Sequence, residues 1–130
     1  MRRASILFSV FAFCAIGLIA QDAADLPQYQ TWMKTAAGAN AALRTAVTAK
    51  DAAAIKDNSA KMADSFDAMA KYWTKLHKDD AVKFAEDARD ASKAVASATS
   101  DADQAAALQK IAGACRGCHT PYRNGSDFKK

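Results

Sequence analysis

Three residues that can bond to metals or to carbon stand close together near the end of the chain. Residues 113–123 read GACRGCHTPYR, in which Cys115, Cys118 and His119 form the pattern C-x-x-C-H. On a helix these positions share one face, because residues three and four apart are neighbours. Two thiols at this spacing can add to the two vinyl groups of one haem while the adjacent imidazole binds its iron. The pattern therefore predicts a site for one covalently attached haem c.

Other uses of the same side chains fit the sequence less well. A zinc site needs four ligands, and His77 is the remaining strong zinc donor outside the motif and the leader segment. A thioredoxin-like redox pair is expected in a βαβ context, and no run of the sequence alternates as strands do. A structural disulfide between the two cysteines would close a very small loop and would leave His119 without a role.

The first twenty residues have the layout of a secretory signal peptide. Arg2 and Arg3 precede the uninterrupted apolar run ILFSVFAFCAIGLIA, residues 6–20, and small polar residues follow it. We expect cleavage after Ala20 or a few residues later, which leaves residues 21–130 as one exported domain in the periplasm. The alternative is an uncleaved membrane anchor, because about 17 apolar residues is the lower limit for spanning a bilayer.

Length and charge narrow the range of functions. A chain of 130 residues has room for one domain. The formal net charge of +4 includes Arg2 and Arg3, so the exported chain would be nearly neutral. No basic cluster interleaved with aromatic residues is present in the sequence, which argues against a nucleic-acid partner. After cleavage we expect no membrane attachment.

From Leu26 onward the apolar residues recur at spacings of three and four, as in amphipathic helices. The two prolines, Pro27 and Pro121, stand near the two ends of this region, and β-branched residues are scarce. Four helical segments are expected. Their apolar stripes are Leu26, Tyr29, Met33, Ala36, Leu43 and Val47; Ile55, Met62, Phe66, Met69, Trp73 and Leu76; Ala81, Phe84, Ala88, Ala91 and Val95; and Ala105, Leu108, Ile111, Ala112, Cys115 and His119.

Short polar junctions separate these segments. Asp51 is a candidate N-cap for the second helix, Asp79 for the third, and Ser100 or Asp101 for the fourth. Short connections between long helices make consecutive helices antiparallel. We therefore predict an all-α fold, an antiparallel up-down-up-down four-helix bundle enclosing one covalent haem.

A second ligand to the haem iron would have to come from upstream of the motif, because neither Met nor His follows His119. In an antiparallel bundle the start of the first helix lies beside the end of the fourth, so Met33 would lie near His119. Met69 and His77, near the end of the second helix, are alternative ligands, and a vacant sixth position is another outcome. Met33 could instead simply fill space in the core, as methionine often does.

The chain resembles the class II c-type cytochromes, the cytochrome c′ family. The resemblance rests on the C-terminal C-x-x-C-H, on Tyr122-Arg123 shortly after it, and on the expected exported bundle. It covers the chain from about Leu26 to Arg123, although the last helix alone carries family-specific residues. It implies a cytochrome domain over residues 21–130.

The resemblance also implies roles for individual residues. Thioether bonds would form at Cys115 and Cys118, and His119 would be the proximal iron ligand. Members differ at one position of the first helix, where low-spin members carry a ligating methionine and high-spin members a non-ligating apolar residue. Met33 aligns with this position, and Tyr29 stands where many members carry an arginine.

The expected function is single-electron transport by a periplasmic carrier that is not an enzyme. Methionine opposite histidine favours the ferrous state and raises the reduction potential. The alternative is a high-spin protein that binds nitric oxide or carbon monoxide, which requires an open or easily displaced sixth position. The expected partners are redox proteins, and the chain would be a monomer or a homodimer.

Overall fold

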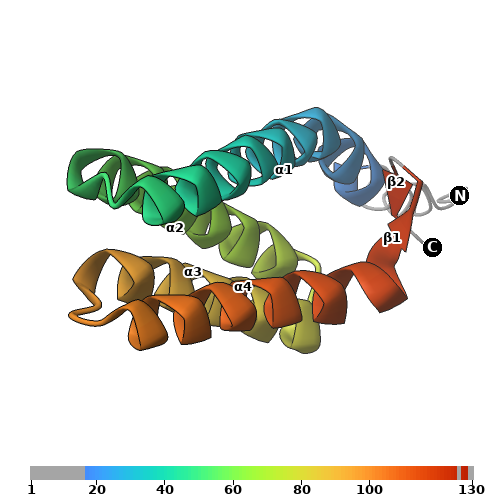
Figure 1. Cartoon of the computed structure of the whole chain (residues 1–130). Helices are drawn as coiled ribbons and strands as arrows, with labels where there is room; N and C mark the ends of the chain where they lie inside the picture. Colours follow the sequence, from blue (N-terminus) through green and yellow to red (C-terminus); the bar gives the residue numbers. More distant parts are fainter. Residues whose placement is uncertain (1–16, 126, 129–130) are drawn as a thin grey trace, which may run out of the picture.

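The computed structural model describes residues 17–125 and 127–128, and nearly all of them are helical (Figure 1). The helices are α1 (Gly17–Ala49), α2 (Ala52–Lys75), α3 (Asp79–Ser97) and α4 (Asp101–Tyr122). The prediction of an all-helical fold with four helices is confirmed. A pair of two-residue antiparallel strands, β1 (Arg123–Asn124) and β2 (Asp127–Phe128), follows α4 and was not predicted.

The predicted signal peptide lies outside the described residues, except for the backbone of residues 17–20 at the start of α1. Across the described residues, no helix combines the length and the apolar character that crossing a membrane requires.

Two of the predicted helix caps are present and one is wrong. Asp51 accepts a hydrogen bond from the backbone N–H of Ala54 at 3.0 Å, and Ser100 accepts one from Asp103 at 3.1 Å. The N-cap of α3 is Lys78 instead of Asp79, and its side chain makes no capping hydrogen bond within the described chain. Asp79 lies in the first turn of α3, where its charge interacts favourably with the helix dipole.

The turn after α2 has a fixed geometry that includes His77. The His77 N–H donates to the Thr74 carbonyl at 3.1 Å, and the Lys78 N–H donates to the Trp73 carbonyl at 3.2 Å. This pair of bonds is a Schellman motif, and it places His77 in the left-handed region at φ 54°. Lys50 has the same φ of 54° in the turn after α1. Both connections are therefore tight reversals of chain direction.

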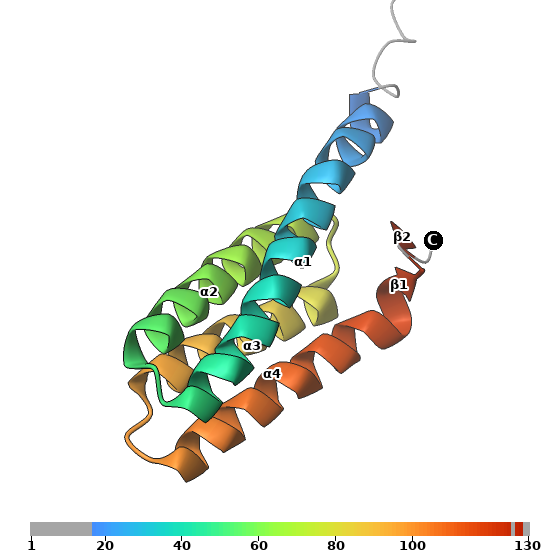
Figure 2. The same cartoon turned by 45° about the horizontal axis from the view of Figure 1, so that its top comes forward.

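Close packing joins each helix to the next in sequence. In the described part of the chain α1 packs on α2, α2 on α3 and α3 on α4, whereas α1 and α4 are not closely packed on each other. Figure 2 shows α1 and α4 nearest where α1 ends and α4 begins, and well separated toward the start of α1 and the end of α4. An ion pair between Lys50 and Asp101, at 3.1 Å, spans the near end. The bundle is therefore open along the α1–α4 edge.

The size of the core side chains changes along the bundle. Near the α1–α2 loop the buried residues are mostly small, including Ala39, Ala46, Ala91, Val95 and Ala107. Toward the opposite end the buried residues include the large side chains of Tyr29, Phe66, Met69, Tyr72 and Trp73, together with the alanines of α3. Among the described residues, the buried aromatic rings therefore come from α1 and α2 at this end.

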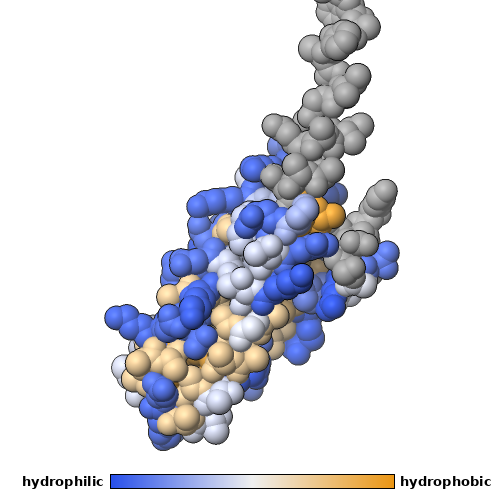
Figure 3. All heavy atoms as spheres, turned by 90° about the horizontal axis from the view of Figure 1, so that it is seen from above, coloured by the Kyte–Doolittle hydropathy of each residue, from blue (hydrophilic) through white to orange (hydrophobic). Residues whose placement is uncertain are grey.

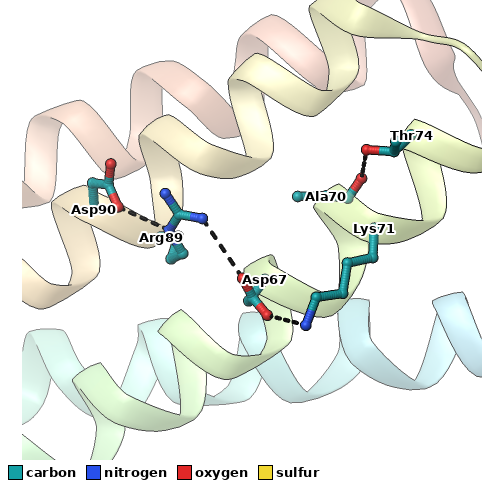
Figure 4. A network of polar contacts seen from close by, with 6 residues as sticks. All are labelled: Asp67, Ala70, Lys71, Thr74, Arg89 and Asp90. Atoms are coloured by element: carbon teal, nitrogen blue, oxygen red, sulfur yellow. Dashed lines mark hydrogen bonds and ion pairs between the residues drawn. The ribbon is translucent and has the colours of Figure 1, made fainter.

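A small group of charged side chains links α2 to α3 (Figure 4). Arg89 of α3 lies 3.6 Å from Asp67 of α2 and donates to Asp90 at 2.8 Å. Lys71 pairs with Asp67 at 2.7 Å on the other side. The hydrogen bond from Lys71, with Arg89 nearby, lowers the pKa of Asp67. Exposed ion pairs contribute little individually, so this group adds mainly to the register of α2 against α3.

Small apolar side chains cover the outer surface at the loop end. In Figure 3 a pale orange area lies toward the end of the molecule farthest from the grey segments, and blue charged side chains surround the rest. Exposed alanines near the α1–α2 junction include Ala41, Ala42, Ala49, Ala52 and Ala53. Each exposed alanine contributes a single methyl group, so the apolar area per residue on this surface is small.

The last turn of α4 is tied to the first turn of α3. The Tyr122 hydroxyl donates to the Asp80 carboxylate at 2.5 Å, and the Ala81 backbone N–H donates to the same carboxylate at 2.9 Å. The bond from Tyr122 lowers the pKa of Asp80, and it raises the pKa of Tyr122 from 10.0 to about 12. The helix that carries the C-x-x-C-H motif is thus anchored beside its end.

The Tyr122–Asp80 hydrogen bond should make stability depend on pH at both extremes. A lowered carboxyl pKa contributes stability that is present above the unfolded value of 3.8 and lost as the pH falls through the folded value. A raised phenol pKa contributes stability that is present below pH 10.0 and lost as the pH rises through about 12. Urea unfolding across pH should therefore show that Tyr122→Phe loses the alkaline effect and weakens the acidic one, because the Ala81 N–H still bonds to Asp80. Asp80→Asn should lose the acidic effect and weaken the alkaline one, because the Asp80 carboxylate is the main cause of the raised Tyr122 pKa. Asp79→Asn is the control and should keep both effects, and an unchanged pH profile in Tyr122→Phe would contradict this assignment.

Candidate functional site

The C-x-x-C-H motif lies within the last two turns of α4. Cys115, Cys118 and His119 are each partly buried, and both cysteines pack against the hydrophobic core. Neither thiol forms a disulfide with another described residue. The helical periodicity thus turns all three reactive side chains toward the interior of the bundle.

Two cavities that share residues adjoin the motif. The inner one has about 20 Å³ of space for a water-sized sphere, hardly more than one water molecule needs, and the outer one has about 310 Å³. Ligand sites in proteins commonly measure about 300–1,000 Å³. Residues lining both cavities are Tyr29, Met33, Trp73, Cys118 and His119. The outer cavity therefore reaches the lower end of the range for ligand sites, whereas the inner one is filled by its own side chains.

The structure brings the predicted site residues together from two helices. Met33 of α1 and His119 of α4 line the same two cavities, Cys118 lines both, and Cys115 lines the inner one. Met69 of α2 also lines the inner cavity. Met33 was expected beside His119 because the first and last helices would be neighbours at this end. The two residues line the same two cavities, although α1 and α4 lie apart there (Figure 2).

His77 has a different position. It is exposed, it occupies the left-handed turn after α2, and it lines neither of the two cavities next to the motif in the described structure. Its backbone is fixed by the turn that reverses the chain between α2 and α3. A ligand role for His77 would require that turn to rearrange.

Aromatic side chains from α1 and α2 form one wall of the cavities. The Trp73 indole N–H donates to the Tyr29 hydroxyl at 3.1 Å, and the two ring centroids are 5.5 Å apart in an edge-on arrangement. Tyr72 packs against Tyr29 with a centroid distance of 4.7 Å. Burial is the main cause that raises the pKa of Tyr29, and the nearby Cys118 adds to it. The wall is thus largely apolar, and within it the Trp73 N–H is bonded to the Tyr29 hydroxyl.

Burial also sets the protonation states of the motif. It raises the pKa of Cys115, and it raises that of Cys118 to about 11, with Cys115 and Asp80 contributing. Burial and then the nearby Arg123 lower the pKa of His119. At neutral pH the thiols are therefore protonated and the imidazole is neutral, which leaves a ring nitrogen lone pair available to a metal.

The entrance to the outer cavity carries positive charge. Lys34 of α1 and Arg123 of β1 both line it, and both side chains are exposed. Arg123 also donates through Nε to the Gly125 carbonyl at 2.8 Å, which holds it beside the end of α4. A ligand that is apolar at one end and acidic at the other would match this arrangement.

The chemistry that these side chains offer is limited in kind. Two thiols can form bonds to carbon, and an imidazole and a thioether are suitable donors to iron. No cluster of three or more His, Cys, Asp or Glu side chains that could hold a metal ion by itself occurs in residues 17–125 and 127–128.

Gly117, inside the motif, makes room for a contact that the sequence analysis did not identify. A Cβ atom at this position would lie closer to the Phe84 ring of α3 than van der Waals contact allows. Phe84 lines the inner cavity beside Cys115 and Cys118. The hydrophobic stripe predicted that Phe84 faces the core, but no pattern within one helix could show which residue of α4 it meets.

Comparison with known proteins does not extend this picture. No family model, curated protein or solved structure matches the chain. The resemblance to class II c-type cytochromes therefore rests on the residues of the motif and on the expected fold alone.

Replacing Gly117 with alanine should disturb the packing of α4 on α3. Overpacking of this kind costs typically about 1–3 kcal/mol, partly offset because alanine favours a helix over glycine by about 1 kcal/mol. Gly113→Ala is the matched control, since its added Cβ would meet nothing within 4 Å among the described residues. Urea unfolding should show Gly113→Ala to be more stable than Gly117→Ala. Equal stability of the two variants would contradict the proposed contact.

Proposed function

We propose that this chain is an exported c-type cytochrome that carries single electrons through one covalently attached haem. The observation that carries the proposal is that Met33 and His119, from opposite ends of the fold in sequence, line the same two cavities beside the motif cysteines. This is the arrangement expected if an iron ion were held between an imidazole and a thioether in a bundle core.

The residues present fit a haem. Cys115 and Cys118 would form the two thioethers, His119 would be the proximal ligand, and Met33 the sixth. Further apolar lining of the inner cavity comes from Phe66, Met69, Trp73, Phe84, Ala85 and Ala88, which suits a flat apolar ring. Lys34 and Arg123 at the entrance suit the two carboxylates that a haem carries.

The chain's own residues would tune and protect such a group. When bound, the haem would supply an iron that gains or loses one electron. The neutral imidazole of His119 is ready to bind metal because its pKa is lowered. The Met33 thioether would favour the reduced state and raise the potential. The aromatic wall of Tyr29 and Trp73 would exclude water from one side of the pocket.

The proposed function also implies a periplasmic location and redox protein partners. Export to the periplasm follows from the signal peptide expected in residues 1–20. Electron transport requires redox protein partners, and the proposal includes neither a catalysed reaction nor a nucleic acid. We propose a monomer or a homodimer.

A high-spin cytochrome that binds nitric oxide or carbon monoxide is the second candidate. It is favoured by one observation, that α1, which carries Met33, is not closely packed against α4 in the described structure. A methionine on a helix with one close neighbour can be displaced more readily than one on a helix enclosed on both sides.

Covalent haem attachment should depend on the two motif cysteines. The wild-type protein, produced with a c-type maturation system, should keep its haem through acid–acetone extraction and through a denaturing gel. The Cys115→Ala, Cys118→Ala double variant should lose covalent haem completely, because both thioether bonds are absent. A Cys115→Ser, Cys118→Ser variant controls for side-chain size. Release of haem from the wild type under the same extraction would refute the proposed function.

Ligation by Met33 should be visible in the optical spectrum of the oxidised protein. A methionine-bound ferric haem shows a weak sulfur-to-iron band near the red end, and the iron is low-spin. Met33→Ala should abolish this band and give a high-spin spectrum. Two control variants should leave the band intact. They are Met69→Ala, whose side chain lines the same inner cavity, and His77→Ala, whose side chain does not. A high-spin wild-type spectrum with ready carbon monoxide binding would support the gas-binding candidate instead.

A further inference from the structure

A set of aromatic rings in contact leads from the cavities to the end of α4. Trp73 lies 5.5 Å from Tyr29 and 4.9 Å from Tyr122 between ring centroids. Trp73 and Tyr122 line the outer cavity together with His119. Tyr122 is therefore both part of the pocket and in ring contact with a second oxidisable side chain.

Tyr122 also has a proton acceptor in place. Its hydroxyl donates to the Asp80 carboxylate at 2.5 Å, within the range of short charge-assisted hydrogen bonds. Asp80 is exposed, and Tyr122 is partly exposed. A phenol that loses an electron becomes strongly acidic, so a carboxylate already bonded to it makes oxidation easier. Tyr29 differs, since it is buried and its hydroxyl accepts a hydrogen bond from Trp73.

We propose that Tyr122, with Asp80 as its proton acceptor, is a redox-active tyrosine. When hydrogen peroxide oxidises a haem bound in the pocket, Tyr122 returns one electron to that pocket. The inference rests on the proposed function, because peroxide is expected to react at a bound haem. Tyr122 and Asp80 then serve a second activity of the same site, which is removal of an oxidising equivalent from the protein interior.

The step balances in electrons and protons. Hydrogen peroxide takes two electrons from the haem-loaded site and two protons from solvent, and it becomes two molecules of water. One of those electrons is replaced by Tyr122, directly or through Trp73 at 4.9 Å. The phenolic O–H bond breaks, the proton moves to Asp80, and a neutral tyrosyl radical remains. A small one-electron reductant of the ascorbate class then restores Tyr122 from the solvent side, and the proton returns to it from Asp80. A second transfer by the same route returns the other electron, so two reductant molecules supply both electrons that the peroxide took.

The test uses the haem-loaded full chain carrying Met33→Ala, because alanine leaves the sixth iron position open to peroxide. Each protein is mixed with hydrogen peroxide, frozen rapidly and examined by electron paramagnetic resonance. The parent should give a tyrosyl signal, Tyr122→Phe should lose it, and Asp80→Asn should reduce its yield several-fold. Asp80→Glu, which retains an acceptor, should restore it. Tyr72→Phe is the matched control, since Tyr72 also contacts Trp73 but does not line either cavity next to the motif in the described structure.

The outcomes separate this inference from the proposed function. A haem stain on a denaturing gel and a circular dichroism spectrum are recorded first for every variant. A haem-loaded parent whose tyrosyl signal persists in Tyr122→Phe, or is unchanged in Asp80→Asn, overturns the inference and leaves the cytochrome proposal standing. Loss of the signal in Tyr72→Phe also overturns it, by assigning the radical elsewhere. A parent chain without covalent haem overturns both proposals.

Discussion

The separation between α1 and α4 is the constraint on which the candidate site depends. Three pairs of consecutive helices pack closely in the described structure, whereas α1 and α4 do not. These two helices come nearest where α1 ends and α4 begins, next to the exposed Lys50–Asp101 ion pair, and lie apart toward the other end (Figure 2). Met33 of α1 and His119 of α4 line the cavities at that open end.

Burial shifts the pKa values of Tyr29, Cys115, Cys118 and His119 in the direction that favours the neutral form. The thiols of Cys115 and Cys118 stay protonated and His119 stays uncharged for the same physical reason, since a charge loses solvation away from water. Positive charge appears at the entrance, on Lys34 and Arg123. The site is therefore electrically neutral inside and basic at its mouth, which suits a ligand with an apolar body and acidic edges.

Local patterns predicted the parts of the structure that depend on sequence neighbours. The four helices follow from apolar periodicity, and the caps at Asp51 and Ser100 follow from side chains that bond within their own first turn. The cap at Asp79 was wrong because the chain enters α3 from a Schellman turn that places Lys78 at the boundary. Two contacts between different helices could not be predicted, namely Phe84 with Gly117 and Tyr122 with Asp80. The apolar periodicity of one helix does not show which residue of another helix a side chain meets. The order of the helices places the start of α1 and the end of α4 at the same end of the fold, where Met33 and the motif line the same cavities.

The order of helix packing determines where the fold can open to admit a large rigid ligand. Helices α1 and α4 are the terminal members of a linear series, so each has one close helical neighbour, while α2 and α3 have two. Local opening is favoured where fewest contacts must break. The left-handed turn at Lys50 gives α1 a natural pivot at the end farthest from Met33. Amide hydrogen exchange would accordingly be fastest in the outer helices, and the interior would be reached by a swing of α1 instead of by global unfolding.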